Sequence, residues 1–299
     1  MTMDTAADRI TVEPIRPLPS LARRMLANPA LVIGLALVGV VVAMAALAPL
    51  ISPYDPYAQD LTARLIPPSW HAKGSWAHPL GTDNLGRDYL SRVIYGARIS
   101  LLIGVSVMII SGLIGTTLGL VAGYFGGKVD MVVNFIITAR LAMPVVLVAL
   151  AVVAMIGGSL TVVILTLGLL KWDRFAVVMR SATQQVRSLD YVTAAEAAGA
   201  SRSRVLLGEI LPNVLPHLIV VATVEAGSAI LLEAALSFLG LGVQPPLPSW
   251  GLMIAEAKNF MFFSFWLIAI PGSALALLVL GINLAGDGLR DVLAPEGRA

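Results

Sequence analysis

Long apolar runs without charged residues dominate the chain and predict helices that cross a membrane. A bilayer core about 30 Å thick requires roughly 20 apolar residues of helix. Runs of that length or more cover residues 29–51, 99–127, 131–170, 213–241 and 259–286. The run 131–170 is too long for one span, and Gly157-Gly158-Ser159 divides it. The pattern therefore predicts an all-α integral membrane protein with six transmembrane helices.

The polar segments between these runs predict the topology. We expect a cytoplasmic N-terminal tail, a first transmembrane helix, an extracytoplasmic loop, a core transmembrane domain with a cytoplasmic loop inside it, and a cytoplasmic C-terminal tail. These cover residues 1–28, 29–51, 52–98, 99–287 with about 181–212, and 288–299, respectively. Placing both termini in the cytoplasm puts eleven Lys and Arg inside and six outside, which agrees with the positive-inside rule.

Composition supports a membrane protein and excludes several other classes. The chain of 299 residues is 58% hydrophobic and 13% charged, whereas soluble domains carry about 25% charged residues. Its mean hydropathy is +0.86. The net charge is only +2, and the basic residues form no stripe of the kind that binds nucleic acid. The chain has no cysteine, so it forms no disulfide and no thiolate metal site.

The motifs of common membrane enzymes are missing, so we expect no catalytic residue, no metal site and no cofactor. His71, His78 and His217 lack the spacing of metal ligands. Gly127-Lys128 superficially resembles a phosphate-binding loop. Such a loop requires glycine where Ala122 stands and Ser or Thr where Val129 stands. If ATP drives this protein, a different polypeptide binds it.

The polar segment before the fifth run carries the most informative motif. Residues 191–213 read YVTAAEAAGASRSRVLLGEILPN. This segment resembles the EAA loop of type I ABC importer permeases, in which a short helix docks into a groove of the cytoplasmic ATPase. The resemblance implies a coupling loop that includes Thr193, Ala194, Ala195, Gly199, Ala200, Ser201, Leu211 and Pro212. Thr193 replaces the leading glutamate of the family pattern, and Glu209 stands where the family has isoleucine.

The residue types of this loop suit a docking role. Small residues let another backbone approach closely, and Gly199 permits the tight turn that ends a helix. Pro212 is expected to stop the segment before the fifth span. The alternative interpretation is an ordinary amphipathic surface helix with a glycine cap.

Four further motifs, in the same order along the chain, resemble the dipeptide, oligopeptide and nickel permeases. They are HPLGTDNLGRD at 78–88, GLVAGYFGG at 119–127, LSFLGLGVQPP at 236–246 and GDGLRD at 286–291. Together with the loop, the resemblance covers residues 23–295. Relatives tend to carry an Arg and an Asp near the third span, where Phe135 and Thr138 stand here, so we do not carry over that charged pair.

The resemblance implies the pore-forming permease subunit of a binding-protein-dependent, ATP-driven importer in the bacterial plasma membrane. Its implied partners are a second homologous permease, two cytoplasmic ATPase subunits or domains, and an extracytoplasmic solute-binding protein. The sequence leaves the solute open among dipeptides, longer peptides, nickel complexes and glutathione-like molecules. The alternatives are a secondary transporter or channel that works alone, whose usual inverted repeats are not evident, and a membrane-embedded hydrolase.

Charged residues inside the apolar runs require an explanation, because insertion of a charge at the bilayer centre costs about 2.5–3.5 kcal/mol. We expect Glu225 and Glu233 to line the translocation path or to pair with a polar group on a neighbouring helix. Glu233 matches the family pattern, which favours a structural role. Arg140 and Lys171 are expected to extend to the cytoplasmic interface, with an ion pair between Arg140 and Asp173 as the alternative.

Overall fold

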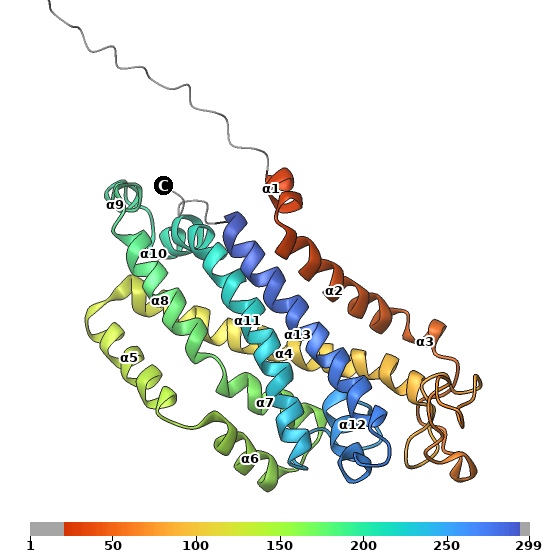
Figure 1. The fold of residues 1–299 in the computed structure, drawn as a ribbon. Helices are drawn as coiled ribbons and strands as arrows, with labels where there is room; N and C mark the ends of the chain where they lie inside the picture. The colour runs from red at the N-terminus through yellow and green to blue at the C-terminus, as the bar shows by residue number, and fades with distance from the viewer. Residues whose placement is uncertain (1–20, 294–299) are drawn as a thin grey trace, which may run out of the picture.

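The computed structural model describes residues 21–293, and its regular structure is helical (Figure 1). The described part of the chain contains no β-strand, only an isolated bridge between Thr82 and Asp88. This confirms the expected all-α fold. The α-helices are α1 (Leu21–Ala27), α2 (Pro29–Ala46), α3 (Ala48–Ile51), α4 (Tyr89–Phe125), α5 (Gly127–Leu141), α6 (Val145–Ile156), α7 (Leu160–Leu170), α8 (Asp173–Arg187), α9 (Asp190–Ala197), α10 (Arg202–Arg204), α11 (Leu211–Phe238), α12 (Trp250–Ala257) and α13 (Trp266–Leu293). The short helical segments are η1 (Leu61–Ala63), the π-helical η2 (Val205–Ile210) and η3 (Lys258–Phe260).

Four of the described helices are long and apolar enough to cross a membrane: α2, α4, the continuous helix Arg202–Phe238, and α13. The helices α5 and α6 pass the same test as a pair, although a bend of 79° separates them. The helix α7 has 11 residues, which span only about 17 Å. This is shorter than the bilayer core, and the amphipathic helix α8 follows after a break at Lys171 and Trp172. The count of six spans stays a prediction.

The two ends of the bundle carry different segments. The helices α1 and α9 and the last turns of α13 lie at one end, at the top of Figure 1. The segment 52–88 and α12 lie at the opposite end. The segments expected in the cytoplasm therefore share one end, as the predicted topology requires. The side of the membrane that this end faces stays a prediction.

Several helices begin elsewhere than the apolar runs suggested. The helix α4 starts at Tyr89 instead of 99, and the Asp88 carboxylate caps it by accepting a hydrogen bond from the Ser91 backbone N–H at 2.8 Å. Arg92 lies inside this helix and is fully buried, although its charge had placed it in a loop. The helix α13 starts at Trp266 instead of 259.

Glycines bring α4 and α8 into direct backbone contact. Gly115, Gly119 and Gly123 repeat every four residues and therefore share one face of α4. A Cβ atom on any of them would lie within 2.8 Å of a backbone carbonyl oxygen between residues 172 and 180. Only glycine allows helices to approach this closely, as at helix interfaces in other membrane proteins.

Pro212 does not stop the helix before the fifth span, so that expectation is wrong. The helix is continuous from Arg202 to Phe238, and the π-helical segment Val205–Ile210 lies just before the proline. In this segment the Leu211 backbone N–H donates to the Leu206 carbonyl, five residues back. A regular α-helix would press the proline ring against the carbonyl four residues earlier. The wider π turn accommodates the ring, so the helix continues.

Candidate functional site

The short helix α9 is the exposed part of the expected coupling loop. Thr193 and Ala194 are exposed on it, whereas Val192 is 1% exposed. Val192 packs in one apolar cluster with Met179 of α8 and Val214 of α11. The loop is therefore anchored to two long helices while its outer surface remains uncovered by the described chain.

Gly199 ends α9 in the way its position predicted. Its φ of +82° lies in the left-handed region that favours glycine. The Gly199 N–H donates to the Glu196 carbonyl at 3.0 Å, and the Ala200 N–H donates to the Ala195 carbonyl at 3.1 Å. These two bonds form a Schellman cap. Ser201 then caps α10, because its hydroxyl accepts a hydrogen bond from the Arg204 N–H at 3.4 Å.

A pocket of about 380 Å³ separates this loop from the end of α4. Across it, the Tyr124 hydroxyl donates to the Glu196 carboxylate at 2.9 Å. The Arg187 guanidinium lies 5.5 Å from the Tyr124 ring centre, and that of Arg202 lies 5.8 Å from the Phe125 ring centre. Cation–π contacts of this kind stabilise the arrangement further. The loop is thus joined to α4 as well as to α8 and α11.

The second candidate site is a buried ion pair between α11 and the junction of α7 and α8. Glu225 is 2% exposed, and its carboxylate lies 2.8 Å from Lys171 Nζ and 3.3 Å from Arg174 Nη1. Lys171 also donates to the Ser228 hydroxyl at 2.8 Å. The expectation that Lys171 extends to the interface is wrong, because Lys171 is 8% exposed and paired inside the bundle.

Arg140 is buried as well and does not extend to the interface. It is 7% exposed, and within residues 21–293 it forms no ion pair with Asp173. Its guanidinium donates to the carbonyl of Leu170, at the end of α7, and to that of Met143, between α5 and α6, at 3.3 Å. Helix ends leave carbonyls without intrahelical partners. Arg140 therefore satisfies the carbonyls that two helix breaks expose.

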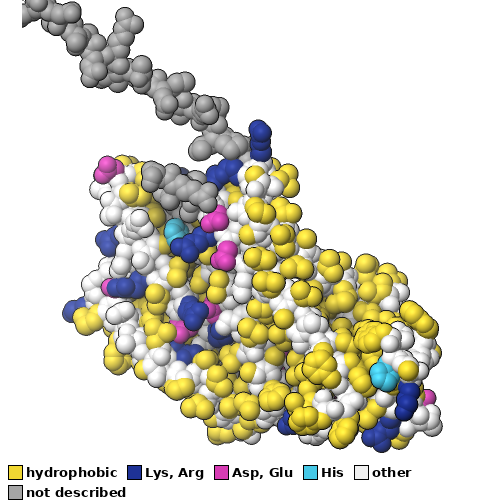
Figure 2. Space-filling view, viewed as in Figure 1, with side chains coloured by type: hydrophobic (Ala, Val, Ile, Leu, Met, Phe, Trp, Pro, Cys, Tyr) yellow, Lys and Arg dark blue, Asp and Glu magenta, His cyan; other side chains and the backbone are white. Residues whose placement is uncertain are grey.

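These charged residues line a pocket of about 450 Å³ whose remaining wall is mostly apolar. The lining residues are Arg140, Leu141, Met143, Val145, Lys171, Asp173, Arg174, Glu225, Ser228, Leu231, Leu232 and Ala235. Figure 2 shows basic and acidic side chains gathered among hydrophobic ones on the face formed by α8 and α11. A charged surface is costly to place against lipid. This face therefore meets water or another protein.

Glu233, the other expected path residue, lies in a closed environment. It is fully buried, and its carboxylate accepts hydrogen bonds from the hydroxyls of Ser237, at 2.7 Å, and Ser249, at 3.0 Å. The Ser249 hydroxyl also caps α12 by accepting from the Leu252 N–H at 3.1 Å. Glu233 thus ties α11 to the start of α12.

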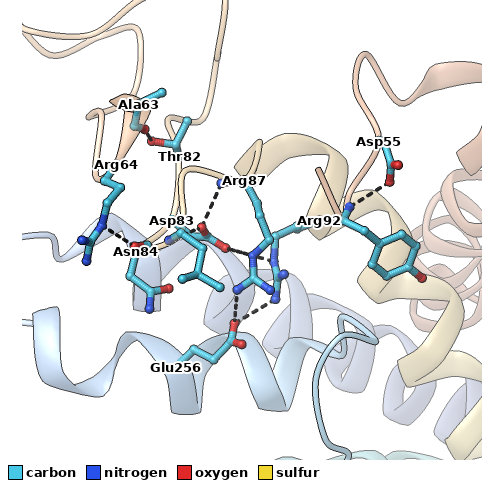
Figure 3. Close-up of polar contacts among 11 residues, drawn as sticks. Asp55, Ala63, Arg64, Thr82, Asp83, Asn84, Arg87, Arg92 and Glu256 are labelled. Carbon is cyan, nitrogen blue, oxygen red and sulfur yellow. Dashed lines mark hydrogen bonds and ion pairs between the residues drawn. The ribbon is translucent and has the colours of Figure 1, made fainter. Parts of the chain in front are cut away.

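A third polar cluster, which the sequence did not reveal, fastens the segment 52–88 to α12 (Figure 3). The Asp83 carboxylate accepts a hydrogen bond from Arg87 Nε at 2.6 Å. The Glu256 carboxylate lies 3.1 Å from Arg87 Nη2 and 2.8 Å from Arg92 Nη2. The spacing of Asp83 and Arg87 is a local signal, but Glu256 lies 164 residues from Arg92 and nothing in the sequence joins them.

The bundle of long apolar helices defines the class of the chain as an integral membrane protein. The fold is similar to that of solved structures of the MetNI methionine ABC transporter in inward-facing conformations. In one crystal form the TM-score is 0.58 at 18% identity, over 68% of this chain and 97% of that chain. A second gives 0.55 at 19% identity, over 67% and 96%. The chain therefore has the fold of a type I ABC importer permease.

Comparison of the sequence shows the family. Residues 115–298 match the binding-protein-dependent transport system inner membrane component, and residues 20–68 match the N-terminal transmembrane domain of oligopeptide transport permease C. The dipeptide permease DppC of Haemophilus influenzae is 41% identical over 96% of this chain and 97% of its own length. That of Escherichia coli K12 is 44% identical over 95% and 94%. The di/tripeptide permease DppC of Pseudomonas aeruginosa is 42% identical over 88% and 87%.

The chain belongs to this family of binding-protein-dependent permeases and is an inner-membrane subunit of an ABC importer. The resemblance first seen in the motifs is confirmed. A secondary transporter that works alone is not favoured.

Proposed function

We propose that this chain is one of two permeases that enclose the translocation path of a di- or oligopeptide importer, and that Glu225 lines this path. The charged face of α8 and α11 carries the proposal (Figure 2). Arg174 is 63% exposed beside the buried Lys171–Glu225 pair, in the first turn of the amphipathic helix α8. A second, homologous permease opposite this face would shield the charges from lipid and leave an aqueous path between the two subunits. The names of the relatives support a peptide as the solute.

The loop 191–212 is the part of the chain that we assign to the ATPase. Its short helix is exposed, rich in small residues and anchored through Val192 and Glu196 to the transmembrane helices. A surface that is both exposed and firmly attached can transmit a displacement. ATP binding would close two separate ATPase subunits, move α9 and change the packing of the two permeases as rigid bodies. The opposite end, with the segment 52–88 and α12, would receive the solute-binding protein.

Glu233 differs from Glu225 in this scheme. Its carboxylate is enclosed between two serine hydroxyls and fixes α12, so its geometry supports positioning of the helix end and not contact with solute. The ion cluster around Glu256 would have the same role for the segment 52–88.

The test is reconstitution of the complete importer in proteoliposomes with its second permease, its ATPase subunits and its solute-binding protein. We expect uptake of labelled dipeptide that requires ATP, the binding protein and this chain. The purified chain alone should hydrolyse no ATP, since it lacks a phosphate-binding loop. Uptake that continues without the ATPase subunits would refute the proposal and would favour a transporter that works alone.

A further inference from the structure

The pocket at the junction of α7 and α8 has the composition of an anion site. Arg140, Lys171 and Arg174 contribute three positive charges, whereas Asp173 and Glu225 contribute two negative charges. The pocket therefore carries an excess of one positive charge. Its volume of about 450 Å³ falls within the range of small-ligand sites, roughly 300–1,000 Å³.

The three basic side chains in this pocket differ in how many of their N–H groups have partners. Lys171 is bound to Glu225 and Ser228, and Arg140 donates to two backbone carbonyls. The Arg174 side chain, in contrast, contacts Glu225 through one nitrogen at 3.3 Å and forms no hydrogen bond within residues 21–293. Its planar fork of N–H groups is suited to a carboxylate, which it binds with two parallel hydrogen bonds.

The carboxylate of Glu225 shows that the pocket already stabilises such a group. It is 98% buried, and its Oε1 accepts no hydrogen bond although it lies beside Arg174. A second carboxylate that approached from solvent could bind the guanidinium N–H groups of Arg174 that do not face Glu225. Glu225 would remain paired with Lys171, so no charge would be left buried without a partner.

We propose that this pocket is a transient binding site for the carboxylate of the transported solute, with Arg174 as the group that contacts it. The inference rests on the proposed peptide importer and adds a point of recognition within the membrane. Every unblocked peptide ends in a carboxylate, so a site of this kind is indifferent to side chains. Because the Arg174 side chain is 63% exposed, water weakens its attraction to the carboxylate. Binding would therefore be weak, and the solute would be released readily.

The experiment measures uptake of one dipeptide and of its C-terminal amide, using a pair that the wild-type importer transports in both forms. Each variant is assayed with the wild-type binding protein, and its uptake is divided by that of the wild type for the same solute. Selection by the binding protein cancels in this ratio. Arg174→Gln should lower uptake of the free dipeptide roughly tenfold and leave uptake of the amide unchanged. Arg174→Lys should give an intermediate loss.

The control is Arg98→Gln, which removes an exposed positive charge on α4 away from this pocket and should affect neither solute. An equal loss of both solutes in Arg174→Gln, or no loss of either, would overturn the carboxylate site while the importer itself stands. If the wild-type assembly takes up no peptide of any kind, the proposed function fails first. The two failures are therefore distinguishable.

Discussion

The substitution Gly199→Asp separates an effect on the coupling loop from an effect on the fold. Gly199 is exposed, and a Cβ atom added to it meets no other atom within 4 Å. The only internal penalty is its φ of +82°, which costs a residue with a side chain about 1 kcal/mol, and Asp tolerates this region better than most. The chain should therefore insert and fold.

Gly240 provides a matched control at the opposite end of α11. It has the same φ of +82°, is exposed, and also leaves a Cβ atom in open space. Gly240→Asp thus carries the same backbone penalty and the same added charge. A difference in uptake between Gly199→Asp and Gly240→Asp would therefore arise from contacts with other subunits of the importer.

We expect Gly199→Asp to lower ATP-dependent uptake by more than tenfold, because a charge forced into a docked interface without a partner costs about 2–4 kcal/mol. The ATPase subunits should co-purify poorly with it. Gly240→Asp should retain uptake, and so should Thr193→Glu, which restores the family residue on the exposed surface of α9. Full transport by Gly199→Asp would refute the assignment and leave an ordinary surface helix.

Further predictions concern the buried charges and the contact between α4 and α8. Glu256→Gln should lower the free energy of unfolding by about 2 kcal/mol, measured by thermal unfolding in detergent, because it leaves a fully buried guanidinium opposite a neutral amide. Lys171→Met and Glu225→Gln should each destabilise the protein, and the double variant should lose less than the sum of the two; additive losses would show that the pair is not coupled. Gly119→Val should prevent folding, since its Cβ would lie 2.7 Å from a backbone carbonyl, whereas Gly39→Val, in open space, should have little effect on the yield of folded protein.

The sequence predicted the features that depend on local composition. Apolar runs indicated the long helices, and Gly199 indicated the turn that ends α9. The start of α4 was misplaced because the charge-free run begins only after Arg98, whereas the helix includes both Arg92 and Arg98. A single sequence does not show that Arg92 can be buried against Glu256. The bend between α5 and α6 lies just before α6, whose N-cap is Pro144. The proline was an available signal for a helix break, because the residue before a proline disfavours the helical region.

The candidate site shows the same division between local and long-range information. The loop was identified from its spacing of small residues, which belongs to one segment. The partners of Glu225 were not identified, because Lys171 and Arg174 lie about 50 residues earlier in the sequence, at the junction of α7 and α8, and approach it only in the folded bundle. The sequence also gave no reason to expect the π-helical turn that carries the helix through Pro212.

The backbone contact between α4 and α8 determines how far a movement of the loop can reach. The 15 residues of α8 form a rod about 22 Å long, with Arg174 near its first residue and α9 beyond its last. Because glycines seat this rod directly on α4, no layer of flexible side chains absorbs a rotation between them. A tilt of α8 by about 10° about its end at α9 would displace its other end, which carries Arg174, by about 4 Å. That displacement exceeds the 3.3 Å between Arg174 and Glu225, so, if α9 docks on the ATPase as proposed, a small rotation of α8 would break this contact.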